Sequence, residues 1–227
     1  MKTLKLKAMA TAATALLLGG AAHAQVTNVS FTSVNSLIPD GNPIGMTSTA
    51  NFSGISGSIS SVTVNLDITG GFNGDLYAYL AGPAGGFAVL LNRTGITAGN
   101  PYGYSDTGFN VTFSDGSPNI HLYQVESPTF DGGGQLTQTW APDGRNIDPL
   151  STPATFDSTS PTADLSSFTG DGANGTWTLF VADLSSGGQS TLASWGVTVV
   201  TTPEPQTWVL AASGMGLLLA LNRRRKL

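Results

Sequence analysis

The chain has 227 residues, enough for one domain with a sizeable core plus targeting segments. It contains no cysteine, which excludes disulfide bonds, thiolate metal sites and cysteine nucleophiles. The net charge of −5 is unevenly distributed: residues 25–202 carry thirteen acidic and two basic side chains, a formal charge of −11, which disfavours nucleic-acid binding and favours cations.

The first 24 residues contain the three parts of a secretory signal peptide in order. A basic start with Lys2, Lys5 and Lys7 leads into an apolar stretch, and Ala22-His23-Ala24 supplies a cleavage site before Gln25. The alternative interpretation is a buried N-terminal helix. We predict that the protein is exported and that residues 1–24 are removed.

Residues 26–52 are polar and interrupted by proline and glycine, which predicts mostly loop with short edge strands. Alternating apolar and polar residues then predict strands over 59–69, 75–80 and 87–91. Because glycine-containing turns separate these three strands, we predict that they form an antiparallel meander.

A further strand is predicted over 109–113, whereas residues 115–160 are the least regular part of the chain. Their prolines and glycines indicate a long excursion over the strands. Structureless loops of that length are uncommon in compact domains, so we predict short strands at 120–125 and 136–140 within it.

The stretch from Gly170 to Thr201 is the one around which we expect the rest to be organised. Alternation about Trp177 and Trp195 predicts two long strands, and the Ser/Gly turn at 185–188 predicts that they pair as an antiparallel hairpin. Each indole alternates with apolar residues, which favours a place in the core over stacking on sugars. We therefore predict that the two indoles point into one core.

Several separated motifs carry a family resemblance. They are Leu37-Ile38-Pro39-Asp40, Gly74-Asp75-Leu76, Asn174-Gly175-Thr176-Trp177-Thr178-Leu179, Asp183, Thr191-Leu192 and Ser194-Trp195. In this order they resemble the P domain, or Homo B domain, which follows the subtilisin-like protease domain in proprotein convertases and also occurs apart from it in bacterial secreted proteins. The resemblance spans about residues 36–201 and implies a jelly-roll-like β-sandwich. The many short alternating strands independently favour an all-β sandwich.

The C-terminal end has the composition of a second targeting segment. Pro203-Glu204-Pro205 precedes an apolar stretch of 14 residues, 208–221, and the basic cluster Arg223, Arg224, Arg225 and Lys226 follows. The apolar stretch predicts a short membrane helix, and the basic cluster after it predicts that the C-terminus is held on the cytoplasmic side of the membrane. The three parts together resemble the PEP-CTERM sorting signal, which implies an exosortase-type processing enzyme. A permanent tail anchor is the alternative.

Proteolysis by this chain itself is disfavoured by its residues. A Ser/His/Asp relay needs an imidazole to accept the serine proton, and His121 is the one histidine after residue 24. No nucleophile turn or subtilisin-like catalytic motif accompanies it. We predict that His121 is a surface or packing residue of an edge strand, that the chain is not an enzyme, and that the family's link to serine endopeptidases comes from neighbouring domains.

Glycoside hydrolysis by paired carboxylates is a weaker alternative. A catalytic acid would need an apolar environment to raise its pKa, and no acidic residue lies inside an apolar run.

Calcium is the cofactor that the composition allows. The resemblance points to Asp40, Asp75 and Asp183 as candidate ligands, because each lies at the end of an expected strand, where loops converge and oxygen donors are plentiful. No DxDxDG loop is present. The alternative is that these carboxylates cap turns by accepting hydrogen bonds from nearby backbone N–H groups.

Two residues of the long excursion are candidate ligand contacts. Trp140 lies where an indole could be partly exposed to solvent. Arg145 is one of only two basic residues between 25 and 202, and an ion pair with Asp143 or Asp148 is its alternative role.

We therefore predict three segments: a signal peptide (1–24), a P/Homo B-like β-sandwich domain (25–202) and a PEP-CTERM sorting and membrane segment (203–227). The predicted function is that of a noncatalytic module sorted to the cell envelope or exopolysaccharide matrix of a Gram-negative bacterium, with a structural, adhesion or protein-interaction role. A P domain accessory to a serine endopeptidase and a carbohydrate-binding module are the alternatives. The expected partners are the exosortase and inner membrane transiently, then an exopolysaccharide or surface protein.

Overall fold

The computed structural model describes residues 26–202 and residue 214. The predicted signal peptide and the predicted sorting signal, Pro203 to Pro205 with Arg223 to Arg225, therefore lie outside the described residues. Within the described part, no helix is both long enough and apolar enough to cross a membrane.

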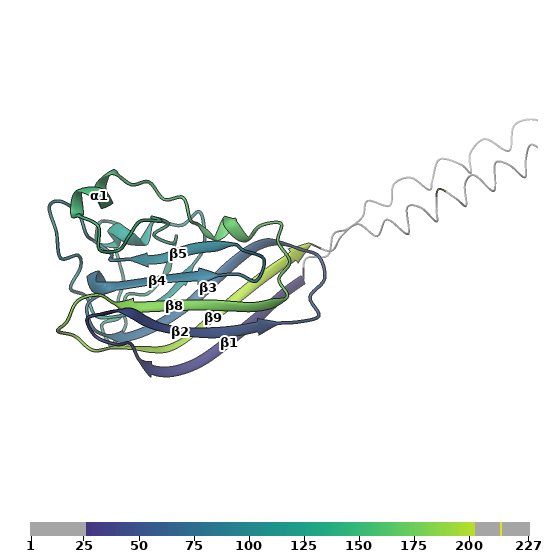
Figure 1. Ribbon diagram of the computed structural model, residues 1–227, viewed down its shortest axis with the longest axis horizontal. Helices are drawn as coiled ribbons and strands as arrows, with labels where there is room; N and C mark the ends of the chain where they lie inside the picture. The colour runs from purple at the N-terminus through teal and green to yellow at the C-terminus, as the bar shows by residue number, and fades with distance from the viewer. Residues whose placement is uncertain (1–25, 203–213, 215–227) are drawn as a thin grey trace, which may run out of the picture. The chain divides into compact units, whose positions relative to one another are not determined.

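Two β-sheets packed face to face make up the fold (Figure 1). The five-stranded sheet has the order β1 (Val26–Leu37), β9 (Ser190–Thr202), β3 (Ser58–Gly70), β6 (Phe109–Phe113) and β7 (Thr139–Trp140). The four-stranded sheet has the order β2 (Asn42–Phe52), β8 (Gly175–Asp183), β4 (Leu76–Ala81) and β5 (Phe87–Asn92). The prediction of an all-β sandwich is confirmed.

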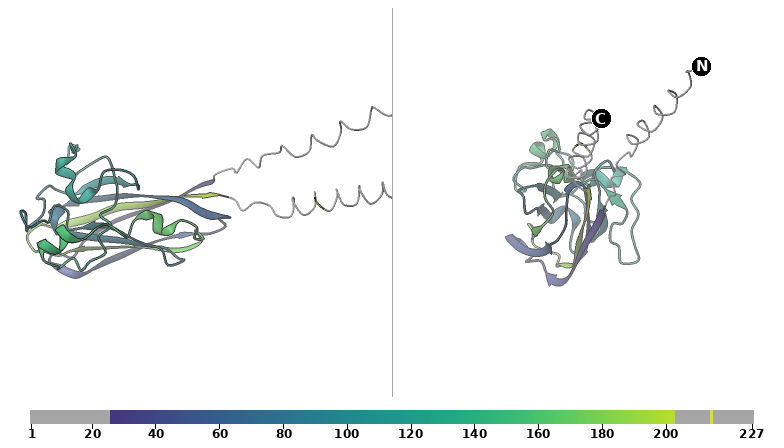
Figure 2. Two further views of the ribbon diagram at one scale, coloured as in Figure 1. Left: turned by 90° about the horizontal axis from the view of Figure 1, so that it is seen from above. Right: turned by 90° about the vertical axis from the view of Figure 1, so that its right-hand side faces the viewer.

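Four short helices lie in the connections: η1 (Asn73–Asp75), η2 (Ile120–Val125), α1 (Pro153–Ser158) and η3 (Leu165–Phe168). Leu165 and Phe168 of η3 belong to the core. Figure 2 gives two further views, in which short helical turns lie in the loops that connect the strands. Figure 1 places β1 and β2 along one border of the sandwich and β5 with α1 along the opposite border.

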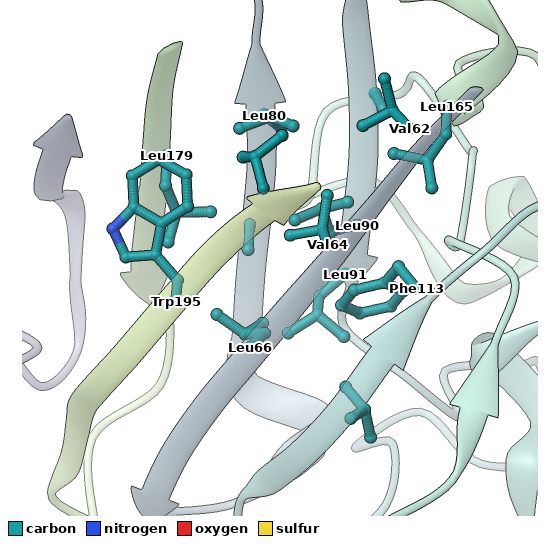
Figure 3. Packing of buried hydrophobic residues seen from close by; sticks show 14 of the residues in the cluster. Val62, Val64, Leu66, Leu80, Leu90, Leu91, Phe113, Leu165, Leu179 and Trp195 are labelled. Atoms are coloured by element: carbon teal, nitrogen blue, oxygen red, sulfur yellow. The ribbon is translucent and has the colours of Figure 1, made fainter. Parts of the chain in front are cut away.

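The core fills the space between the two sheets. Alternate residues of the long strands point into it, among them Val64 and Leu66 of β3 and Leu80 of β4 (Figure 3). Trp177 of β8 and Trp195 of β9 are both fully buried there. The prediction that the two indoles share one core is confirmed.

The predicted hairpin of the two Trp-bearing strands is wrong. β8 pairs with β2 and β4 in one sheet, whereas β9 pairs with β1 and β3 in the other. The connection at 184–189 crosses between the sheets instead of turning within one. The alternating pattern is the same in both arrangements, because it specifies which face of a strand is buried and not which strand lies beside it.

The predicted meander over 59–91 is wrong for the same reason. β4 and β5 pair with each other, but β3 belongs to the opposite sheet, where it pairs with β6 and β9. The short helix η1 carries the chain from one layer to the other.

Residues 26–52 form two long edge strands, where mostly loop with short edge strands was predicted. β1 pairs with β9 from Val26↔Thr201 to Leu37↔Thr191, and β2 pairs with β8. Both have one long partner that satisfies a full row of backbone hydrogen bonds, so weakly apolar, Ser/Thr-rich sequences still form strands. A bulge between Ser33 and Ser36 of β1 places Asn35 at a positive φ.

The long excursion also departs from prediction at one point. Residues 120–125 form the 3-10 helix η2 and not a strand, because the Asn119 side chain accepts a hydrogen bond from the His121 backbone N–H and begins a helical turn. The strand predicted over 136–140 is confirmed in its last two residues as β7, which pairs in parallel with β6. Asp143, Gly144 and Ala163 form backbone hydrogen bonds with β5 and cover its outer edge.

Candidate functional site

An open hollow of about 690 Å³ lies at the end of the sandwich where β8 and β9 are connected. Its walls come from four parts of the chain: the short helix η1, the loop before β6, the 184–189 connection and the turn between β1 and β2. The lining residues are Gly41, Phe72, Asp75, Tyr102, Gly103, Tyr104, Ser105, Leu184, Ser185 and Ser186.

Backbone pairing brings the three predicted aspartates to this end. Asp183, the last residue of β8, stands directly opposite Asn42 of β2 and Leu76 of β4. The Leu184 N–H donates to the backbone carbonyl of Asp75 at 2.9 Å. The Asp40 carboxylate accepts a hydrogen bond from the Gly187 N–H at 3.3 Å. Segments more than a hundred residues apart in sequence thus meet around Asp183.

Asp183 is the most deeply buried of the three, at 1% exposed. One carboxylate oxygen accepts from the Ser190 hydroxyl at 3.0 Å, and the other accepts from the Ser185 N–H at 3.4 Å. Burial raises the pKa of Asp183, the hydrogen bonds from Ser190 and Ser185 oppose that rise, and the negative charges of Asp75 and Asp40 add to it. The site therefore favours the neutral carboxyl more than water does.

Asp75 shares this environment. Burial raises its pKa, while the hydrogen bond from the Ser185 side chain and the positive charge of Arg93 act in the opposite direction. Burial also lowers the pKa of Arg93, and the charge of Asp75 opposes that shift. The Arg93 Nε donates to the Gly74 carbonyl at 3.2 Å, which keeps the guanidinium at the base of η1.

The arrangement bears on calcium in two ways. The three candidate ligands lie at the same end of the fold, as expected. Within residues 26–202, however, no group of three or more carboxylate or imidazole side chains is placed to hold a metal ion. Asp40 and Asp183 accept hydrogen bonds from turn N–H groups, as the alternative interpretation expects. Calcium binding here stays a prediction that would depend on backbone carbonyl and hydroxyl oxygens as further ligands.

His121 occupies a different place from the one predicted. It is 2% exposed and lies in η2, stacked on the Phe156 ring with centroids 5.8 Å apart. Its Nδ1 is 2.6 Å from a carboxylate oxygen of Asp143, and its Nε2 donates to the Ile96 carbonyl at 2.9 Å. Because a carbonyl oxygen can only accept, Nε2 cannot take a proton from a serine. His121 is a packing residue, in a helix and not an edge strand.

The His121–Asp143 pair was missed by sequence reasoning. The two residues are 22 positions apart in irregular chain, and no periodicity marks either of them. Asp143 is fully buried and also forms an ion pair with Arg145 at 3.1 Å, which confirms the ion-pair role weighed for Arg145. Through these two contacts Asp143 connects His121 of η2 to the segment around Arg145.

Trp140 does not offer the exposed ring considered for it. The indole is 2% exposed, and its Nε1 donates to the Thr137 carbonyl at 2.7 Å. The reason is the short parallel pairing of β7 with β6, which turns this side chain inward against Tyr123. Trp140 is a core residue and is not available as a surface ligand contact.

Aromatic residues do gather on a surface, at positions that were not singled out from sequence. Tyr77 and Tyr79 of β4, Phe87 of β5 and Phe180 of β8 form a contiguous, half-buried group on the outer face of the four-stranded sheet. The signal was present in the alternation. Leu76, Ala78 and Leu80 alternate with Tyr77 and Tyr79 along the predicted strand, so the two tyrosines had to point to the face opposite the three apolar residues.

No protein-family model and no curated protein sequence matches the chain. Among solved structures, the serine protease of Aeromonas sobria is similar over 78% of this chain, with 17% identity and a TM-score of 0.44. A chain from the complex of that protease with the chaperone ORF2 gives the same identity and TM-score over 79% of this chain. The aligned region is 27% of the length of each of those chains, and a similarity at this score carries no conclusion about function.

The raised pKa of Asp183 sets a direction for pH dependence. In the unfolded chain this carboxyl titrates near its ordinary pKa of 3.8, whereas the folded protein holds the proton to higher pH. The folded state therefore binds more protons between the two values, so this group's contribution to stability falls as the pH rises through that window.

Asp183→Asn removes the titration. We expect the free energy of unfolding of the variant, relative to the wild type, to increase as the pH rises from about 3.8, measured by urea denaturation. A difference that is flat or decreases with pH would contradict this account.

The calcium prediction is tested by the melting temperature in millimolar calcium and in chelator. Ligation at this end of the fold would raise the melting temperature by mass action, and the rise would be lost in Asp183→Asn. An unchanged melting temperature removes the prediction.

Proposed function

We propose that this chain is an exported, noncatalytic β-sandwich module that acts by binding another protein, with a secreted serine endopeptidase as its partner. The observation that carries the proposal is the convergence of the P-domain-like motifs. Leu37 to Asp40, Gly74 to Leu76 and the segment around Asp183 are far apart in sequence and meet at one end of the sandwich. This placement supports the resemblance, because motifs that matched the P domain by chance would not be expected to lie next to one another in the fold.

The motif residues act as a structural frame and not as a reaction centre. Ile38 and Leu76 are fully buried, and the Ile38 N–H donates to the Ser190 carbonyl at 2.9 Å. His121 is engaged by Asp143 and by the Ile96 carbonyl. Any serine-protease relay in such an assembly is therefore supplied by the partner, and this chain contributes binding.

Strand β1 is the surface best suited to a protein partner. It ends the order of the five-stranded sheet, so one side of its backbone has no neighbouring strand within the described residues. Val29, Phe31 and Leu37 project from it, each 64% exposed. Free edges are usually protected by charge or proline, yet residues 26–37 contain neither. An extended segment of a partner can add to this edge through backbone hydrogen bonds, with the apolar side chains giving contact area.

Export and surface sorting belong to the same proposal. They rest on the sequence of residues 1–24 and 203–227, which resembles a signal peptide and a PEP-CTERM segment. The intact mass of the protein extracted from the cell surface tests this. We expect a chain from Gln25 to the Pro203 region, whereas a mass that retains Arg223 to Leu227 would mean that the tail stays as an anchor.

The binding proposal is tested with the purified exported protein and the secreted serine endopeptidases of the same organism, by biolayer interferometry. We expect at least one of these enzymes to bind with micromolar or tighter affinity, and Phe31→Lys to weaken that binding at least tenfold by placing a charge on the open edge. The control is Leu150→Lys, at a side chain that is 60% exposed outside both sheets.

Two results would overturn the proposal. One is that none of these endopeptidases binds. The other is hydrolysis of a fluorogenic peptide by the protein alone that His121→Gln abolishes while leaving the circular dichroism spectrum unchanged.

A further inference from the structure

The outer face of the four-stranded sheet carries a strip of aromatic rings. Tyr77 and Tyr79 project outward from β4, while their neighbours Leu76, Ala78 and Leu80 are fully buried on the inner face. Phe87 of β5 and Phe180 of β8 continue the strip on either side. All four rings are half-buried, so each keeps part of its surface in water.

The rings hold one another in fixed positions. Tyr79 and Phe180 are directly opposite in the β4–β8 register and stack, with centroids 4.9 Å apart and planes 14° apart. Phe87 lies 5.0 Å from Tyr79 with its plane tilted by 41°. Tyr77 meets Tyr79 and Phe180 edge-on, at 6.0 and 6.1 Å. The planes of Tyr77 and Phe87 are thus inclined to the central stack, and both residues keep part of their surface in water.

A glycine of β2 makes room beside Phe180. A Cβ at Gly45 would lie 2.8 Å from the tip of the Phe180 ring and 2.4 Å from the Val181 carbonyl oxygen, and the backbone there has a φ of +56°. Gly45 therefore lets the tip of the Phe180 ring approach the β2 backbone closely. The strip therefore extends from β5 across β4 and β8 to β2.

Short uncharged polar side chains border the strip on the β2 side. Thr47 stands opposite Phe180, Thr49 opposite Thr178, and Asn51 opposite Thr176, so all share the outer face. None of the residues that β2, β4 and β8 present on this face is charged. On the other side the chain between Asp143 and Ala163 covers the edge of β5.

The chemistry of this face selects its ligand. Aromatic rings bind the apolar C–H faces of sugar rings, and hydroxyl and amide groups bind the sugar hydroxyls. The absence of basic side chains on the outer faces of β2, β4 and β8, with the acidic charge of the domain, disfavours nucleic acids, anionic lipids and anionic glycans. An uncharged polyhydroxylated polymer matches both the rings and the uncharged polar border on the β2 side.

We propose that this face, centred on Tyr77, Tyr79, Phe87 and Phe180, is a binding site for an uncharged polysaccharide. Tyr77 and Phe87 stack on sugar rings, the Tyr79–Phe180 pair fixes their positions, and Thr47, Thr49 and Asn51 bind hydroxyl groups along the chain. This site is separate from the proposed protein-binding edge, since β1 belongs to the opposite sheet. The protein could therefore hold a partner protein and a matrix polymer together.

The test uses the purified exported protein and hexasaccharides of neutral glucan, mannan, xylan and galactan, with hexameric alginate as the anionic comparison, by isothermal titration calorimetry. We expect binding of at least one neutral hexasaccharide with a dissociation constant of millimolar or tighter, and no binding of alginate. Tyr77→Ala and Phe87→Ala should each weaken that binding at least tenfold. The matched control is Tyr102→Ala, a tyrosine that is 83% exposed at the separate hollow, which should leave the affinity unchanged.

Three results would overturn the proposal. The first is that no neutral hexasaccharide binds. The second is that alginate binds more tightly than every neutral glycan. The third is that Tyr102→Ala weakens binding as much as Tyr77→Ala does. Melting temperatures of the variants show that a loss of affinity is not a loss of fold, and Phe87→Tyr, which keeps a ring, should restore binding. Failure here leaves the endopeptidase-binding proposal standing, because Phe31, whose substitution tests that proposal, lies on β1 in the opposite sheet.

Discussion

The structure depends on the burial of two indoles between two sheets. Trp177 of β8 and Trp195 of β9 lie in opposite layers, and each is fully buried. Each also has its N–H satisfied: Trp177 donates to the Ala173 carbonyl at 3.0 Å, and Trp195 donates to the Ser48 hydroxyl at 2.8 Å. The second bond joins β9 of one sheet to β2 of the other. Because truncating a buried tryptophan typically costs about 3–5 kcal/mol, these residues account for a large share of a stability that is about 5–15 kcal/mol in most domains.

This packing explains why family-like motifs coincide with structural positions. The strands that carry the indoles are central in their sheets, with β8 between β2 and β4 and β9 between β1 and β3. Their connection has to cross the end of the sandwich, and Asp183 lies where it begins. The hydrogen bonds of Asp183 to Ser190 and Ser185 hold that crossing. The two surfaces that we propose for binding, the free edge of β1 and the aromatic face of β4, β5 and β8, lie away from this crossing.

Sequence patterns predicted the strands well and their partners poorly. The strand over Leu76 to Leu80 and the inward direction of Trp177 and Trp195 follow from alternation, which reports the face of each side chain. Pairing is decided by contacts across the whole domain, so β8 and β9 looked like one hairpin although they lie in different sheets. The length of β1 was missed because its inward residues are small and polar apart from Val34, so its extended shape depends on pairing with β9.

The candidate sites were predictable to different degrees. Asp40, Asp75 and Asp183 were placed at strand ends from motifs, and they do meet at one end of the fold. Tyr77 and Tyr79 followed from the alternation on β4, but their grouping with Phe180 required the β4–β8 register. The His121–Asp143 pair and the burial of Trp140 could not be inferred, since both depend on how an irregular excursion folds back over the sheets.

Hydrogen exchange of the two indole N–H groups, followed by NMR, tests the central role of this packing most directly. We predict that the Trp177 and Trp195 N–H protons exchange only through global unfolding, so that their exchange free energies equal the free energy of unfolding measured by denaturant. Exchange of either proton at the rate of a solvent-exposed indole would show that the indoles do not hold the two sheets together, and would contradict the account.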